Sequence, residues 1–183
     1  IFLKKLKITE FVYNKKINLF LESLLGAKFK IRNVEIFNKP AKTGMPAPIH
    51  QDNFYWNVKN RKALNLWLSF NHVSKKNGGM FYFRGSHKMG LLSHVNSYAK
   101  GSSKKLSDNQ LKKVLEKYKI YTPSLNPGDL LIHHCEVVHG SNKNNSNIDR
   151  RAIVISLISN DAIYDKKKIN KYLKSLKKQI KIN

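Results

Sequence analysis

Three residues of the sequence have the types and the spacing of a metal site. His50 and Asp52 lie two positions apart, and His139 lies far downstream. On an extended strand, residues two apart face the same way, so His50 and Asp52 can present an imidazole and a carboxylate to one point. A second histidine from a distant strand would complete a two-histidine, one-carboxylate triad, which is typical of non-haem Fe(II) and leaves positions open for a cosubstrate and O2. The sequence therefore predicts His50, Asp52 and His139 as iron ligands.

An arginine follows the distal histidine at the start of the last apolar strand. Its planar guanidinium can bind the far carboxylate of a dicarboxylate cosubstrate bidentately, while the keto-acid end of that cosubstrate chelates the metal. Arg150 is the first candidate for this role, and its neighbour Arg151 is the next. Strand alternation lets only one of the two point inward. The triad and the arginine, in this order, are a more specific pattern than a His-x-Asp alone, which is common by chance.

The remaining histidines have simpler interpretations. His87 belongs to the turn Arg84-Gly85-Ser86-His87 and is predicted to be structural. His133 and His134 are adjacent on a strand, so one points inward and one outward. The spacing from His134 to Arg150 is wrong for the third ligand. Two others have no supporting neighbours: His72 and His94.

The elements that must position these residues are mostly short strands between two helices. The apolar spacing predicts an amphipathic helix over 8–25, extended runs at 28–37, 50–58, 63–71, 80–84, 130–138 and 151–158, a polar loop at 93–105, a short helix at 107–117 and a lysine-rich amphipathic helix at about 165–182. This order predicts one domain over residues 1–183, mainly β with flanking helices, whose β core spans about 28–160. The absence of an initial methionine leaves open that the chain is part of a longer one.

The charge of the chain suggests a rival function. The formal net charge is +24, and nearly all of the positive residues are lysines spread along the chain. This pattern indicates a solvated basic surface, although a non-catalytic basic β-sandwich that binds a polyanion, such as nucleic acid or an acidic membrane surface, stays the alternative. No apolar run approaches the roughly 20 residues of a membrane-spanning helix, and no export signal is evident. The single cysteine, Cys135, is interpreted as a small buried hydrophobe and favours a cytoplasmic location.

Four stretches of the sequence resemble the phytanoyl-CoA dioxygenase-like branch of the Fe(II)/2-oxoglutarate oxygenases. They are Lys39-Pro40 through Asp52; Trp67-Leu68-Ser69 through Gly79; Arg84-Gly85-Ser86-His87-Lys88; and Gly128-Asp129 through His139-Gly140-Ser141, Asn144, Ser146 and Arg150-Arg151. The resemblance implies a double-stranded β-helix (jelly-roll) core. It also implies that His50, Asp52 and His139 hold iron, and that further residues bind 2-oxoglutarate: Arg150, Ser141, Gln51, Trp67 and Lys39.

The chemistry that the resemblance implies is hydroxylation. 2-Oxoglutarate would be decarboxylated to succinate and CO2 with O2 as the other cosubstrate, and an unidentified small organic molecule, mildly favoured to be anionic, would gain a hydroxyl group. Related halogenases have a small residue in place of the carboxylate ligand, so Asp52 favours hydroxylation. Two features depart from the family pattern: the N-terminal helical region is short, and the usual Pro-Gly-Ser-His turn begins with Arg84. A family member that binds metal but has lost its substrate is a further alternative.

Overall fold

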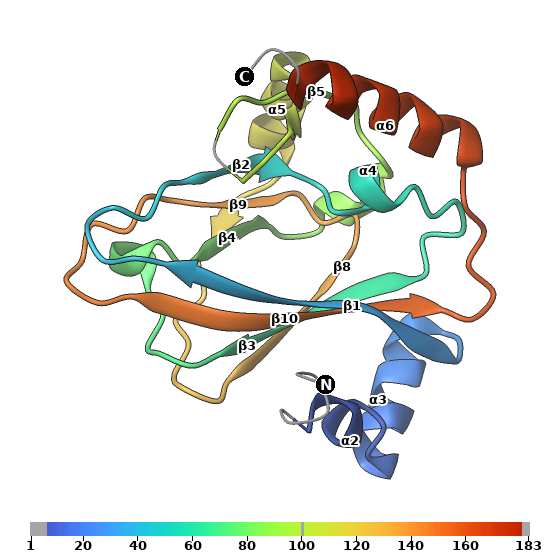
Figure 1. Cartoon of the computed structure of the whole chain (residues 1–183), viewed down its shortest axis with the longest axis horizontal. Helices are drawn as coiled ribbons and strands as arrows, with labels where there is room; N and C mark the ends of the chain where they lie inside the picture. Colours follow the sequence, from blue (N-terminus) through green and yellow to red (C-terminus); the bar gives the residue numbers. More distant parts are fainter. Residues whose placement is uncertain (1–6, 100, 181–183) are drawn as a thin grey trace.

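Two four-stranded antiparallel sheets face each other in the computed structural model, which describes residues 7–99 and 101–180 (Figure 1). The larger sheet has the order β1 (Phe29–Lys39), β10 (Arg150–Ser159), β3 (Ala63–Ser69) and β8 (Leu130–His134). The smaller sheet has the order β2 (Ala47–His50), β9 (His139–Ser141), β4 (Met80–Phe83) and β7 (Ile120–Tyr121). The predicted class, mainly β with flanking helices, is confirmed.

The central strand β10 is covered on both faces. Ile153, Ile155 and Leu157 pack with Val12 and Leu21 of the N-terminal helices, on the outside of the larger sheet. Ala152 and Val154, which alternate with them, pack with Trp67 toward the smaller sheet. A strand buried on both faces has no polar alternation, which explains the continuous apolar run in this part of the sequence. Arg150 shares the inward face because it lies two residues before Ala152.

The predicted helix over 8–25 is two helices, α2 (Ile8–Val12) and α3 (Lys15–Leu25). Asn14 separates them, and its side-chain oxygen accepts a hydrogen bond from the backbone N–H of Lys16 at 3.1 Å. Val12 and Leu21 are both fully buried, so the apolar stripe continues across the break. The single-helix prediction was wrong because it followed the continuous apolar stripe and ignored Asn14, whose residue type is preferred at the start of a helix.

Two predicted strands are shorter than expected. β2 ends at His50, and a single helical turn, α4 (Asn53–Trp56), replaces the extended run predicted to reach residue 58. The aromatic side chains of α4 gave this segment the composition of a strand, and four residues are too few to show helical periodicity. Both features favoured the strand prediction. β8 ends at His134, and a turn leads from it to β9.

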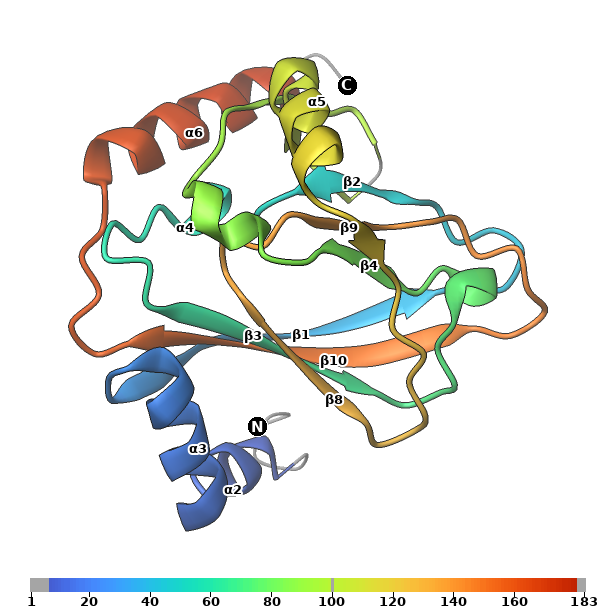
Figure 2. The same ribbon diagram turned by 180° about the vertical axis from the view of Figure 1, so that it is seen from behind.

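The remaining elements lie on the side of the smaller sheet, opposite α2 and α3 (Figures 1 and 2). The segment predicted as a polar loop contains a hairpin of β5 (His94–Asn96) and β6 (Lys104–Leu106), followed by α5 (Asp108–Lys117). The basic helix α6 spans Lys166–Ile180, and residues 181–182 of its predicted range lie outside the described residues. Two short 3-10 helices, Lys75–Asn77 and Ser86–Met89, complete the connections. Among the described residues, no helix is long and apolar enough to cross a membrane.

Candidate metal centre and anion site

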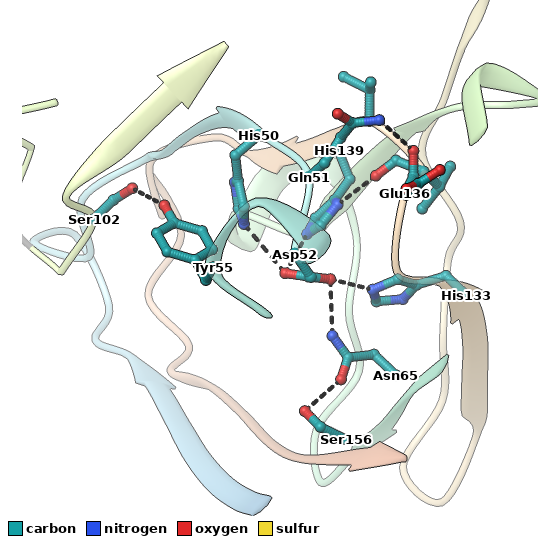
Figure 3. A network of polar contacts seen from close by, with 12 residues as sticks. His50, Gln51, Asp52, Tyr55, Asn65, Ser102, His133, Glu136, His139 and Ser156 are labelled. Carbon is teal, nitrogen blue, oxygen red and sulfur yellow. Dashed lines mark hydrogen bonds and ion pairs between the residues drawn. The ribbon is translucent and has the colours of Figure 1, made fainter. Parts of the chain in front are cut away.

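The structure brings His50, Asp52 and His139 together between the two sheets. His50 ends β2 and His139 begins β9, where the two are paired in register, and Asp52 precedes α4. One ligand atom from each residue lies within 4.8 Å of the others. Oδ1 of Asp52 is 3.5 Å from Nε2 of His50 and 3.7 Å from Nε2 of His139 (Figure 3). Asp52 has helical dihedral angles, so the turn into α4, rather than strand alternation, aims its carboxylate at the histidines.

Backbone carbonyls orient both imidazole rings. Nδ1 of His50 lies 2.7 Å from the carbonyl oxygen of Pro48, and Nδ1 of His139 lies 3.0 Å from that of Val137. A carbonyl only accepts, so each Nδ1 must carry a proton, and in a neutral ring Nε2 then has a free lone pair. Hydrogen bonds of this kind are typical of metal-bound histidines because they set the tautomer and the direction of the ring.

Burial and mutual contacts determine the charges of the three groups. Burial lowers the pKa of His139 to about 3, so its imidazole is neutral. Burial also opposes the charged form of His50, but the hydrogen bond to Asp52, the charge of Asp52 and the carbonyl oxygen of Pro48 together outweigh it and raise the pKa of His50. Burial alone would raise the pKa of Asp52, yet the neighbouring histidines hold it well below its usual range. The carboxylate is therefore anionic, as a metal ligand must be.

A buried arginine faces inward near the triad. Arg150 is 4% exposed, and its guanidinium lies 5.2 Å from the ring centroid of Trp67. Its Nε and Nη1 atoms are buried without a hydrogen-bond partner, and burial lowers its pKa to about 10. Arg151 is exposed and pairs with Asp149 at 2.8 Å, so Arg150 is the inward member of the pair.

Lys39 lies beside Arg150 across the β1–β10 pair. Its Nζ donates to Oγ of Ser141 and to the carbonyl oxygen of Asn142, both at 2.6 Å. Burial, and then the nearby charge of Arg150, lowers the pKa of Lys39 to about 7. Two buried cations and unpartnered guanidinium donors are the features of a carboxylate site, because buried donors without an acceptor are costly. Lys39, Ser141, Arg150 and Trp67 thus gather in one place.

Gln51 does not join them. Its side-chain nitrogen donates to the carbonyl oxygens of Gly90 and Glu136, at 2.9 and 2.7 Å, and its oxygen accepts from the backbone N–H of Leu92 at 2.8 Å. These three contacts leave the amide little capacity for a cosubstrate. The expected cosubstrate contact is corrected: the Gln51 side chain ties the segment before Asp52 to the surrounding loops.

Sequence reasoning missed two supporting histidines. His133 contacts the second oxygen of Asp52, at 3.2 Å from Nε2. His94 accepts a hydrogen bond at Nε2 from the backbone N–H of Gln51 at 3.0 Å, and its ring stacks on Phe54. Alternation along β8 showed that either His133 or His134 points inward but not which one. No local signal marked His94, because its partners come from distant segments.

A sequence profile of the phytanoyl-CoA dioxygenase (PhyH) family matches residues 4–152, which is most of the chain. The chain belongs to the phytanoyl-CoA dioxygenase family. The chain is 30% identical over 155 residues to a probable alpha-ketoglutarate-dependent hypophosphite dioxygenase of Stutzerimonas stutzeri, covering 85% of this chain and 54% of that protein. It is 25% identical over 149 residues to the human peroxisomal phytanoyl-CoA dioxygenase, covering 79% and 44% respectively.

Solved structures support the fold of this family member. EctD from S. alaskensis, solved with 2-oxoglutarate and 5-hydroxyectoine, aligns with a TM-score of 0.69 at 19% identity, over 83% of this chain and 52% of EctD. The alpha ketoglutarate dependent carbocyclase SnoK from nogalamycin biosynthesis aligns with a TM-score of 0.68 at 24% identity, over 86% of this chain and 61% of SnoK. The predicted double-stranded β-helix core is therefore confirmed. The chain spans about half the length of the curated relatives it matches.

Proposed function

We propose that this family member is an Fe(II)- and 2-oxoglutarate-dependent dioxygenase that hydroxylates a small organic molecule. The observation that carries the proposal is the convergence of two imidazoles and one carboxylate within 4.8 Å, beside a buried guanidinium with unpartnered donors. Two nitrogens and one carboxylate oxygen suit Fe(II) and leave coordination positions for other ligands. The names of the relatives, which include alpha-ketoglutarate-dependent enzymes, support the same reading.

The residues near Arg150 would hold the cosubstrate. The guanidinium of Arg150 can donate two hydrogen bonds to the distal carboxylate of 2-oxoglutarate. The ammonium group of Lys39 and the hydroxyl of Ser141 can contact the same carboxylate, and the guanidinium of Arg150 packs over the Trp67 ring. A dicarboxylate bound here would supply the counter-charge that Lys39 and Arg150 lack among the described residues.

The metal, when bound, would let O2 oxidise 2-oxoglutarate to succinate and CO2 with transfer of the second oxygen atom into a C–H bond of the substrate. The side chains of the protein position the reactants and exclude water. The ring of Tyr55 lies edge-on to His50 at 5.9 Å between centroids, and its hydroxyl donates to the carbonyl oxygen of Lys104 at 3.1 Å. The ring centroid of Tyr172 of α6 lies 5.6 Å from that of Tyr55, so α6 lies against this side of the site.

The substrate is proposed to be a small, anionic organic molecule. The supporting feature is the net charge of +24, which attracts anions over a long range. Asp52 supports hydroxylation rather than halogenation, since its carboxylate occupies the position that a halide ion would need. A cytoplasmic location is also proposed, supported by the buried single cysteine and by the need to keep iron as Fe(II).

The test is an anaerobic titration of the Fe(II)-loaded protein with 2-oxoglutarate, followed by the weak visible absorption band of iron chelated by a 2-oxo acid. We expect a band that requires iron, that needs more 2-oxoglutarate in Arg150→Ala, and that is absent in His139→Ala. A folded, iron-supplemented protein that gives no band would contradict the proposal. It would also favour the rival function, a basic β-sandwich that binds a polyanion, whose next test is salt-dependent binding to a nucleic acid.

A further inference from the structure

We infer that His133 and Asn65 form a cradle for one oxygen of Asp52, so that only the other oxygen is presented to the metal. The inference rests on the proposed function and names two positioning residues for the same site. Nδ2 of Asn65 donates to Oδ2 of Asp52 at 2.8 Å, and Nε2 of His133 lies 3.2 Å from the same atom. Oδ1 is the oxygen that faces His50 and His139 (Figure 3).

The two cradle residues come from adjacent strands. Asn65 on β3 and His133 on β8 are direct partners in the antiparallel register of the larger sheet. Cross-strand partners project from the same face, so both side chains point at Asp52 from the sheet opposite His50 and His139. Both are buried, at 5% exposure for Asn65 and 9% for His133. The carboxylate is thus held between the sheets, with one oxygen toward each.

Each cradle residue is itself polarised by a hydroxyl group. Oγ of Ser156 donates to Oδ1 of Asn65 at 2.6 Å, which requires the amide nitrogen of Asn65 to face Asp52. The hydroxyl of Tyr82 lies 3.4 Å from Nδ1 of His133. The anionic carboxylate of Asp52 only accepts, so Nε2 of His133 carries a proton, and in a neutral ring Nδ1 then accepts from the Tyr82 hydroxyl. The two hydrogen-bonded pairs, Ser156 with Asn65 and Tyr82 with His133, therefore each end in an N–H donor to Oδ2 of Asp52.

This arrangement restricts how Asp52 can bind a metal. A carboxylate has about four lone-pair positions and can chelate through both oxygens. Two buried donors on Oδ2 oppose that mode, because a metal bond to Oδ2 would take one of its two lone-pair positions and leave one donor unpaired, at a cost of roughly 1 to 3 kcal/mol. Partners of this kind typically change metal affinity by about 10- to 100-fold when they are lost.

The first test measures metal affinity rather than turnover. Mn(II) binding is determined by calorimetry for the wild type, His133→Leu, His133→Gln and Asn65→Leu, with circular dichroism to confirm folding. We expect the two leucine variants to bind Mn(II) about 10- to 100-fold more weakly. His133→Gln keeps an N–H donor and should recover most of the affinity. His134→Gln is the matched control, because its ring contacts His87 and lies on the opposite face of the same strand.

The second test is chemical rescue. Asp52→Gly removes the carboxylate but leaves the two donors, so added formate should restore Mn(II) binding. In the double variant Asp52→Gly with His133→Leu, formate should restore much less, which a purely structural role of His133 would not produce. Unchanged affinity in both leucine variants, or equal rescue in the single and double variants, would overturn the cradle. Complete loss of binding in His133→Gln would instead make His133 a ligand. A wild type that binds no metal would reject the proposed function, a result separate from these.

Discussion

Replacing Arg150 with methionine removes the unpartnered guanidinium but keeps most of its volume over Trp67. Truncating one member of a buried charge pair typically costs about 2 to 4 kcal/mol of binding free energy. That corresponds to a roughly 30- to 700-fold weaker affinity for 2-oxoglutarate. In the unliganded protein the same change removes two buried donors, Nε and Nη1, that have no acceptor. Stability without ligand should therefore hold or rise while ligand binding falls.

Thermal unfolding of the Fe(II) protein under anaerobic conditions separates the two effects. At a 2-oxoglutarate concentration 100 times the wild-type Kd, binding stabilises by about 2.7 kcal/mol. For a chain of this size that is a rise in Tm of roughly 5 to 10 °C. The weaker affinity of Arg150→Met reduces the same rise to less than roughly 3 °C.

Arg151→Met is the control for the Arg150 experiment. Arg151 has the same side-chain type one position away, but it is exposed and pairs with Asp149. It should keep the full ligand-induced rise in Tm. The reasoning would be refuted if Arg150→Met kept that rise, or if Arg151→Met lost it.

Two further changes test the surroundings of the site. Because the pKa of Lys39 is lowered to about 7, its charge is lost as pH rises from 6 to 8, so 2-oxoglutarate should bind more weakly, by at most about tenfold per pH unit, and calorimetry of Lys39→Met should show a flatter profile. In the unfolded state Lys39 keeps its ordinary pKa of 10.5 and binds this proton up to that pH. Lys39 therefore makes the wild-type unfolding free energy rise with pH between about 7 and 10.5, a slope that Lys39→Met should reduce. Arg61→Ala leaves the buried carboxylate of Glu136 without its 2.5 Å partner and should destabilise by about 1 to 3 kcal/mol in urea unfolding, a range discounted because the Arg61 side chain is 43% exposed. Lys62→Ala, which breaks the exposed pair with Asp161, should cost under about 1 kcal/mol, and equal losses would contradict this account.

The sequence alone predicted which side chains could form the candidate site. His50 and Asp52 are close in the chain, and only a few residue types suit a metal or a dicarboxylate, so identity and order carried the prediction. The alternation of inward and outward residues also limited the choice between Arg150 and Arg151 to one of the two. The mainly β class followed from many short strands bounded by turn residues, which is a local property of the chain, whereas the jelly-roll core was implied by the resemblance to the family.

The local sequence pattern did not predict the conformation of short segments such as the one that follows His50. Asp52 was expected on a strand, but the chain turns into α4 directly after β2. The contacts of Asn53 explain this turn: its side chain donates to Glu136 and to the carbonyl oxygen of Val58, and accepts from the N–H of Val58. These bonds close the turn, and one of them depends on a residue far along the chain.

Tertiary structure alone decided which polar groups support Asp52. His133 and Asn65 became its partners because the β3–β8 register sets them side by side, and a shift of β8 by one residue would have turned His133 away from the site. Lys39 came to lie beside Arg150 in the same way, through the pairing of β1 with β10. Sequence determines the chemical groups and the local alternation of faces. Contacts between distant strands depend on the strand register, which is set by the packing of the whole core.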